Sequence, residues 1–238
     1  MTVRQRIDGA RAFLLHAHPY SETSLVIDVF ARDHGRLALL ARGARRPRSA
    51  MRGVLLAFQP LEFGWHGGGE VKTLAKAEWL GGLPLLTGRS LLLGYYLNEL
   101  LLKLLPREDA HPALFDAYAA TLAALSANAE ATELRRFEKA LLRELGYGLS
   151  LERDAVSGQP LLPDANYVYQ IERGAVAADE GGHGFAYLGK TLLDIAADNY
   201  SDPRTAAESK QLMRQLFGHY LGGQALQSRR VFMELQEL

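Results

Sequence analysis

Five arginines fall within eleven consecutive residues of this chain: Arg42, Arg45, Arg46, Arg48 and Arg52. Glycine and proline lie between them, and the segment has no apolar face to bury, so we expect a solvated, mobile loop. A planar guanidinium group carries N–H donors in a fork that matches two phosphate oxygens. The cluster is therefore a candidate phosphate clamp. The alternative interpretation is a loop that is merely soluble.

Other reactive side chains form no recognisable catalytic set. The chain contains no cysteine, which excludes disulfides, a thiolate nucleophile and a cysteine-bound metal. His16 and His18 have no third ligand nearby, so we predict no metal site. Glu22 and Glu70 are single carboxylates on expected β segments rather than an acid–base pair. We predict a protein that is not an enzyme and has no cofactor, and convergence of distant residues stays open as the alternative.

The overall composition is that of an ordinary globular chain. Its 238 residues, 48% of them hydrophobic, can form one large or two small domains. The formal net charge is zero and the pI is about 7.1, so positive charge matters only where it is clustered. The N-terminus lacks an apolar signal core, and no apolar run reaches transmembrane length. We expect a soluble, intracellular protein with no membrane partner.

The arginine cluster follows a predicted hairpin inside a β-rich region. Short strands are expected at residues 11–16, 25–30, 37–40, 55–66 and 71–80. Five short strands with glycine-rich joints fit a small barrel of the OB type, and we assign it residues 1–81. In this barrel Phe58, Phe63 and Trp65 are candidates for stacking on nucleic-acid bases, although alternation places some of them in the core.

Helical periodicity begins after residue 82. Helices are expected at residues 91–105, 112–125, 132–145, 188–197 and 203–220. A β insertion at about residues 150–187 interrupts them, with a strand at 167–171. The predicted fold class is therefore α+β, with a mainly helical second domain over residues 82–238.

One helix of that domain combines an apolar stripe with a basic face. Leu134, Phe137 and Leu141 recur at steps of three and four and should face the helical bundle. Arg136, Lys139 and Arg143 lie three and four residues apart on another face, with Arg135 beside them. A solvated basic face is the default interpretation. The alternative is a docking surface for an acidic peptide.

Several short motifs, in order and in register, resemble the RecO family of DNA-repair proteins. They include Tyr20-Ser21-Glu22-Thr23-Ser24, Ala41-Arg42-Gly43-Ala44-Arg45, Phe58-Gln59-Pro60, Gly69-Glu70-Val71-Lys72-Thr73-Leu74, Asn98-Glu99-Leu100-Leu101, Arg135-Arg136-Phe137-Glu138, Leu145-Gly146-Tyr147-Gly148 and Tyr220-Leu221-Gly222-Gly223. The resemblance runs from about residue 10 to the C-terminus. It implies an N-terminal OB fold and a helical C-terminal domain, which agrees with the periodicity.

The resemblance also implies a function and partners. It implies a non-enzymatic recombination mediator in the cytoplasm, associated with the nucleoid, that binds single- and double-stranded DNA and anneals strands. Implied partners are RecR and the acidic C-terminal tail of the single-strand-binding protein. The residue matching the family's tail-binding position is Arg135, with Arg136, Phe137 and Lys139 in support. An RNA-binding OB module and a nucleic-acid-modifying enzyme are the alternatives.

The sequence departs from the family where many members carry a four-cysteine zinc site. The first pair is replaced by Asp154 and Ser157, and the second pair is also absent. Structural zinc needs thiolate or imidazole ligands, so we predict a degenerate zinc-finger-like insertion that folds without metal. At two positions where the family has a lysine, this chain has another residue. Arg42 keeps the positive charge, whereas Gln227 does not.

Overall fold

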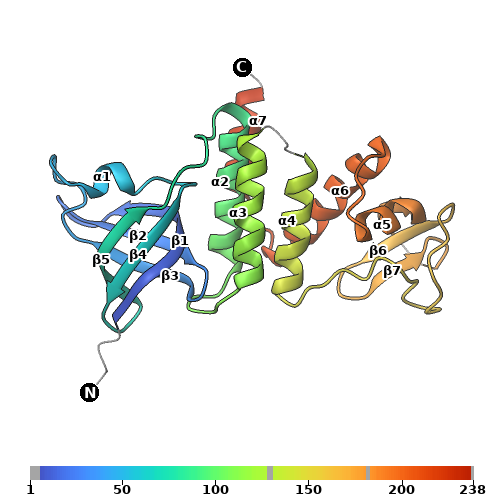
Figure 1. Ribbon diagram of the computed structural model, residues 1–238. Helices are drawn as coiled ribbons and strands as arrows, with labels where there is room; N and C mark the ends of the chain where they lie inside the picture. The colour runs from blue at the N-terminus through green and yellow to red at the C-terminus, as the bar shows by residue number, and fades with distance from the viewer. Residues whose placement is uncertain (1–5, 128–130, 181–182, 237–238) are drawn as a thin grey trace. The chain divides into compact units, whose positions relative to one another are not determined.

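The computed structural model describes residues 6–127, 131–180 and 183–236 (Figure 1). Tertiary contacts divide the chain into two compact units, Met1–Asn128 with Leu226–Leu238, and Ala129–Ala225. The first unit contains α2 (Gly88–Leu104), α3 (Pro112–Ser126) and α7 (Gln227–Gln236) together with the N-terminal strands. The sequence predicted a boundary after residue 81, where strands give way to helices. The compact units divide the chain later, after Asn128.

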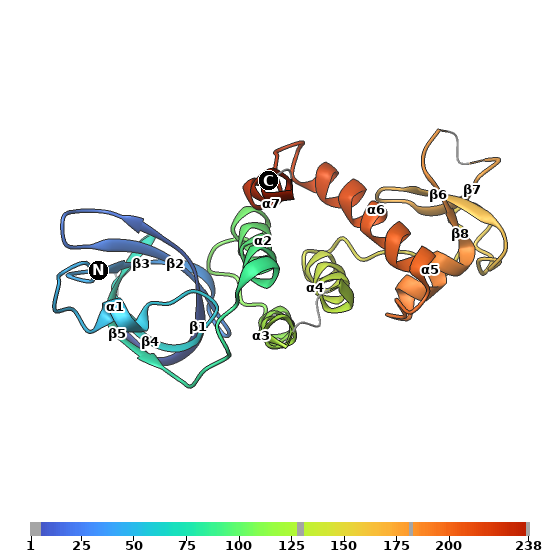
Figure 2. The same ribbon diagram turned by 90° about the horizontal axis from the view of Figure 1, so that it is seen from above.

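The N-terminal strands form a closed barrel in the order β1-β2-β3-β5-β4, and they curve around a common axis in Figure 2. They are β1 (Arg6–Pro19), β2 (Leu25–Ala31), β3 (Gly35–Ala41), β4 (Pro60–His66) and β5 (Val71–Trp79). A parallel pairing of β3 with β5 completes the ring. This arrangement confirms the predicted five-stranded barrel of the OB type.

Strand β1 is longer than the six residues predicted, because it serves two neighbours. Its first half pairs with β4, from Arg6 opposite His66, and its second half pairs with β2, as far as Pro19 opposite Leu25. A register shift between Leu14 and His16 marks the bend between the halves. The polar residues at both ends of β1 hid this length from a search for apolar runs.

Strand alternation fills the barrel. Ile27, Val29, Leu37 and Leu39 are essentially inaccessible to solvent, as alternate positions of β2 and β3 should be. Phe63 and Trp65 of β4 join the same core, with 0% and 2% of their surfaces exposed. These two predicted stacking residues are therefore core residues. Phe58 is also buried, with its ring edge-on to Tyr95 of α2.

The segment between β3 and β4 does bury an apolar face, so the prediction that it has none is wrong. Ala44 is part of the barrel core, and Met51, Val54 and Leu55 pack against that core. The last three follow the i, i+3, i+4 spacing of a helix, and Met51–Val54 forms the short helix α1. This spacing is visible in the sequence, but the arginines around it obscured it. The strand predicted from residue 55 accordingly starts only at Pro60.

Outward-facing aromatic side chains join the barrel to α2 and α3. Phe13 and Phe30 pack against Phe115 and Tyr118, with ring centroids 5.1–6.3 Å apart. Within this contact, Asn98 Nδ2 donates to the carbonyl of Leu15 at 2.9 Å. The Asn98 side-chain oxygen accepts a hydrogen bond from the Tyr118 hydroxyl. Buried polar groups are thus paired, as an apolar interface requires.

Helix α7 returns to this unit from the far end of the chain and lies beside α2 (Figure 2). The Glu99 carboxylate of α2 accepts hydrogen bonds from the backbone N–H groups of Gln227 and Ser228, both at 2.9 Å. These are orphan donors of the first turn of α7, so Glu99 caps that helix from outside. The guanidinium of Arg89 lies 5.6 Å from the ring centre of Phe232 and adds a cation–π contact.

The second unit combines helices with a small antiparallel sheet. The helices are α4 (Ala131–Glu144), α5 (Gly189–Ala196) and α6 (Pro203–Tyr220). The sheet has the order β7-β6-β8, with β6 (Asn166–Gln170), β7 (Gly174–Ala177) and β8 (Ala186–Leu188). The predicted strand at residues 167–171 is confirmed as β6. Strands β7 and β8 are only four and three residues long, too short for their alternation to be read.

Candidate nucleic-acid interface

The arginine loop, defined as residues 42–52, presents all five of its arginines to solvent. Arg42 directly follows β3, and Arg52 lies on α1. The buried Ala44 and the apolar side of α1 fix the loop against the barrel, so its charged side faces outward. The cluster is therefore a surface of cations on a packed support.

Arg45 has a second role, because it joins the arginine loop to the turn between β1 and β2. Its backbone N–H donates to the carbonyl of Thr23 at 2.9 Å, and its Nη1 donates to the carbonyl of Ser21 at 2.6 Å. That turn is closed on itself by a hydrogen bond from the Tyr20 N–H to the Ser24 carbonyl, at 3.1 Å. The arginine loop and the β1–β2 turn are thus hydrogen-bonded to each other.

The other four arginines of the loop carry charge that nothing nearby compensates. Within the described residues no carboxylate forms an ion pair with Arg42, Arg46, Arg48 or Arg52. The two joined loops contain only one acidic residue, Glu22, against five arginines. Such an excess of guanidinium groups attracts anions with several oxygens, above all phosphates.

Several other arginines of this unit are compensated. Arg32 lies 2.8 Å from a carboxylate oxygen of Asp116. Arg36 and Arg107 both approach Asp28, at 3.7 and 3.0 Å. The contrast distinguishes the arginine loop, where four exposed arginines without a carboxylate partner in the described part of the chain lie close together in the sequence.

The aromatic side chains that the barrel exposes are not the predicted ones. Among the phenylalanine, tyrosine and tryptophan rings of residues 6–80, Tyr20 and Trp79 are exposed, at 68% and 58% of their surfaces. Tyr20 belongs to the turn that Arg45 holds. The exposure of Tyr20 could have been predicted from the sequence, because the polar residues Ser21–Ser24 follow it and offer no apolar surface to cover the ring.

On α4 the predicted partner-binding residues have unequal surroundings. Phe137 is a core residue with 1% of its surface exposed. Lys139 Nζ donates to the carbonyls of Ile195 and Ala196, at 2.9 and 3.0 Å, and so caps the C-terminus of α5. Arg135 Nη1 lies 2.7 Å from the buried Glu138, whereas Arg136 pairs with Glu133 at 2.5 Å and leaves 47% of its side chain exposed.

The loop between α5 and α6 lies against these basic residues. Asp198 pairs with Lys139 at 2.6 Å. The Tyr200 hydroxyl is buried and has no hydrogen-bond partner within the described residues. Its burial, and then the charge of Asp198, raise the pKa of Tyr200, so the hydroxyl stays protonated.

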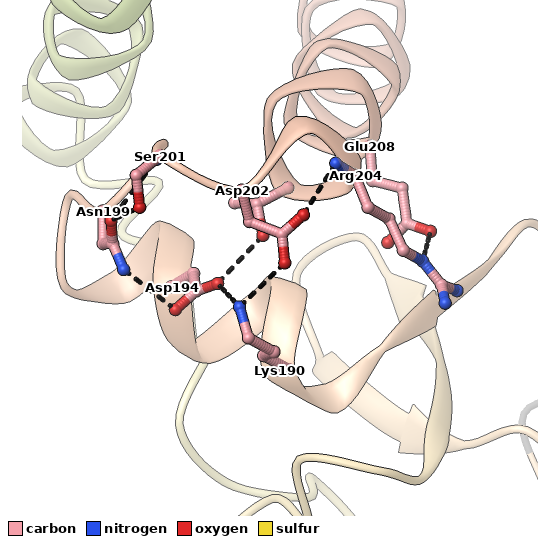
Figure 3. A network of polar contacts seen from close by, with 8 residues as sticks. Lys190, Asp194, Asn199, Ser201, Asp202, Arg204 and Glu208 are labelled. Atoms are coloured by element: carbon pink, nitrogen blue, oxygen red, sulfur yellow. Dashed lines mark hydrogen bonds and ion pairs between the residues drawn. The ribbon is translucent and has the colours of Figure 1, made fainter.

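A network of polar contacts fixes this loop at both of its ends (Figure 3). Lys190 Nζ donates to Oδ2 of Asp194 at 2.5 Å and to Oδ2 of Asp202 at 3.0 Å. Thr205 Oγ1 donates to the same Asp194 oxygen at 2.9 Å. Asp202 also accepts the Arg204 N–H and so begins α6. The network therefore joins α5 to the first turn of α6 and anchors both ends of the loop between them.

The Asp154 carboxylate organises the β insertion. Its Oδ1 accepts hydrogen bonds from the N–H groups of Val156 and Ser157, at 2.9 and 2.7 Å, and from the Ser157 hydroxyl at 2.9 Å. Its Oδ2 accepts the N–H of Ala177 at 2.9 Å, from the end of β7. The hydrogen bonds from Ser157 contribute most to holding the pKa of Asp154 below its ordinary value. One carboxylate thus joins two segments more than twenty residues apart.

Comparison with known proteins decides the family. A family model described as "Recombination protein O N terminal" matches residues 8–83, and one described as "Recombination protein O C terminal" matches residues 86–230. The chain belongs to the RecO family. It is similar to proteins named DNA repair protein RecO from Aromatoleum aromaticum, Azoarcus sp. and Dechloromonas aromatica. These are 59%, 58% and 57% identical over 100% of both chains.

Membership of the RecO family supports a role in DNA repair and recombination, with DNA binding. The similar proteins are named as repair proteins, and none of these names states an enzymatic activity. In the described part of the chain, no helix combines the length and apolar character needed to cross a bilayer.

The zinc site of many RecO-family members does not fit the residues found here. The chain has no cysteine. Both Asp154 oxygens already accept hydrogen bonds, and Ser157 uses its hydroxyl in one of them. Among the residues that the structure describes, no group of three or more histidine, aspartate or glutamate side chains is arranged to hold a metal ion. In this segment the Asp154 carboxylate and the backbone amides that donate to it join the two parts of the insertion.

Proposed function

We propose that this RecO-family chain binds single- and double-stranded DNA through its arginine loop and anneals complementary strands without enzymatic chemistry. The observation that carries the proposal is the set of four exposed, uncompensated arginines on a packed support. Backbone phosphates supply most of the affinity of sequence-independent DNA binding, and such cations suit them. On the family resemblance, we also propose RecR and the single-strand-binding protein as partners, in the cytoplasm and at the nucleoid.

The salt dependence of binding tests the phosphate contacts. Each phosphate neutralised on a single strand adds about 0.7 to the slope of log affinity against log salt. Replacing Arg46 and Arg48 by Ala should flatten that slope by about 1.4 if both contact phosphates. These two are chosen because Arg45 also supports the turn. The matched control replaces Arg6 and Lys76 by Ala, which removes equal charge from the same barrel, where both are paired with carboxylates.

A strand-annealing assay tests the activity itself. Complementary strands coated with single-strand-binding protein should anneal faster when the chain is added, and more slowly with the Arg46→Ala/Arg48→Ala variant. No acceleration by the wild-type chain would exclude the annealing role. Parallel titrations with deoxyuridine and uridine oligonucleotides separate DNA from RNA binding, because the two differ only in the 2′-hydroxyl.

For the partner tail we propose Arg136, with 47% of its side chain exposed, as the most accessible direct contact on α4, and Arg135 beside it, where it also pairs with the buried Glu138. Lys139 is engaged by α5, and Phe137 is buried, so both are proposed to support the position of the helix rather than to contact the peptide. The acidic tail of the single-strand-binding protein offers carboxylates that guanidinium groups bind well. A short peptide at such a surface should bind at about the micromolar level.

Charge reversal on α4 tests this surface. Arg136→Glu and Arg135→Glu should each weaken binding of a labelled tail peptide while binding of bare DNA is retained. The matched control is Arg143→Glu, which reverses an exposed charge on the same helix. Equal affinities for all variants would remove α4 from the proposed site, and parallel loss of DNA binding would indicate a folding defect. Arg136→Glu is the more direct test, because Arg135 also neutralises the buried Glu138.

A further inference from the structure

The outer faces of β2 and β3 offer no ring on which a base can stack. Their outward positions include Val26, Arg36, Ala38 and Leu40, and the remaining ring, Phe30, is buried against α3. Stacking requires an accessible aromatic face. A single-stranded ligand of this barrel must therefore find its stacking surface on a loop or a strand end.

Tyr20 and Trp79, the two exposed rings of the barrel introduced above, differ in their contacts with the rest of the protein. Trp79 donates its Nε1–H to Gln59 at 3.2 Å, and the backbone at Gly82 lies so close that an added Cβ would be 2.6 Å from the indole. Tyr20, by contrast, has no ring contact or side-chain hydrogen bond within the described residues. Its ring is available to a ligand.

The backbone of Tyr20 is also held in a turn that is hydrogen-bonded to the arginine loop. Its own N–H bonds to the Ser24 carbonyl, and the Ser24 N–H bonds to the Ser21 hydroxyl at 3.2 Å. Arg45 then holds this turn through the carbonyls of Ser21 and Thr23. A binding site for single-stranded DNA needs a ring for the bases and cations for the phosphates close together, since bases and phosphates alternate along the strand. The joined loops supply both.

From this arrangement we infer that Tyr20 is a base-stacking residue of the single-stranded DNA site. The inference rests on the proposed DNA-binding function and deepens it. A base in a duplex is stacked on its neighbours and cannot also cover the tyrosine ring. Tyr20 therefore favours single strands over duplex, whereas the arginines serve both. Because every base has a π face, the contact is tolerant of sequence.

The test compares Tyr20→Ala with wild type in titrations of the full chain against oligodeoxythymidine and against a duplex of equal length. Loss of one stacking contact should weaken single-strand binding between about fivefold and about 150-fold. Duplex affinity and the salt slope should stay unchanged, because no phosphate contact is lost. Tyr20→Phe and Tyr20→Trp should bind like wild type, since both retain a ring.

Two controls keep the test decisive. Tyr20→Ala leaves the backbone acceptors of Arg45 in place, and unchanged fluorescence of the buried Trp65 would show an intact barrel. Trp79→Ala examines the other exposed ring. The inference is overturned if Tyr20→Ala binds single strands like wild type, or if Trp79→Ala alone causes the loss. In either case binding that still depends on Arg46 and Arg48 leaves the proposed function standing, whereas a wild-type chain that binds no DNA refutes the function itself.

Cross-linking gives an independent readout. Oligonucleotides that contain 5-iododeoxyuridine react under ultraviolet light with aromatic side chains in contact with the base. We expect the cross-linked peptide to contain Tyr20, with the yield lost in Tyr20→Ala. Cross-links confined to other peptides would contradict the inference.

Discussion

Replacing Asp154 by Ala should destabilise the second unit by about 3 kcal/mol. The change removes the acceptor of three backbone N–H groups and one hydroxyl. A hydrogen bond to a neutral partner contributes about 1 kcal/mol net, and one to a charged group about 1.5–3 kcal/mol. Val156 and Ser157 are exposed, so water can replace part of the hydrogen bonding that their N–H groups lose. The N–H of the more enclosed Ala177 is less well solvated, so its lost hydrogen bond costs more. The expected loss is well below that of four full hydrogen bonds to a charged group and well above the effect of a surface mutation.

The pH dependence follows from the same contacts. The pKa of Asp154 is lowered in the folded state, so its stabilisation is fully present above the unfolded value of about 3.9 and is lost as the pH falls through the lower folded value. Asp154→Asn should cost less than Asp154→Ala, because one oxygen can still accept from Val156 and Ser157. Its amide would face the N–H of Ala177, however, and the acid-dependent part of the stability should disappear.

The assay uses the positions of the tryptophans. Both Trp65 and Trp79 lie in the first unit, so their fluorescence reports that unit and serves as an internal control. Hydrogen exchange of the amides at Val156, Ser157 and Ala177 reports the second unit. We expect faster exchange there and a melting transition at least about 12 °C lower, with unchanged tryptophan signals. Unchanged exchange at these amides, or a loss below about 0.5 kcal/mol, would refute the role given to the carboxylate.

Three further outcomes follow from other contacts. Dialysis against a metal chelator should leave the melting of the second unit unchanged, because Asp154 rather than an ion joins its segments; a fall in melting temperature would contradict this. Asn98→Ala should cost about 2–4 kcal/mol in urea unfolding followed by Trp65 fluorescence, since two buried hydrogen bonds are lost. Tyr118→Phe should cost less. Glu99→Ala should increase hydrogen exchange in the first turn of α7, including Ser228, and leave the barrel signal unchanged; equal exchange would show that α7 needs no cap.

Local periodicity was sufficient for much of the architecture. The five short strands with glycine-rich joints predicted a small barrel, and the structure closes one from β1 to β5. On α4 the steps of three and four between Leu134, Phe137 and Leu141 predicted the buried stripe. The charge of the arginine loop is likewise a property of the sequence alone.

Local patterns failed where two readings of one segment competed. Met51, Val54 and Leu55 have helical spacing, but surrounding arginines and glycines indicated a loop. Phe63 and Trp65 have rings suited to stacking, but their strand positions turn them into the core. Only the closure of the barrel decides such cases, because it determines which side of each strand is the inside.

Compensation of charge between distant segments was decided by the tertiary structure. Arg32 meets Asp116, and Asp28 is shared with Arg107, across sequence separations of 84 and 79 residues that no local pattern reveals. The arginine loop receives no such partner within the described residues. The sequence by itself therefore determined how many cations the loop carries. The fold determined that they remain uncompensated, and that Tyr20 stands beside them, since only folding brings carboxylates from distant segments to some arginines and not to others.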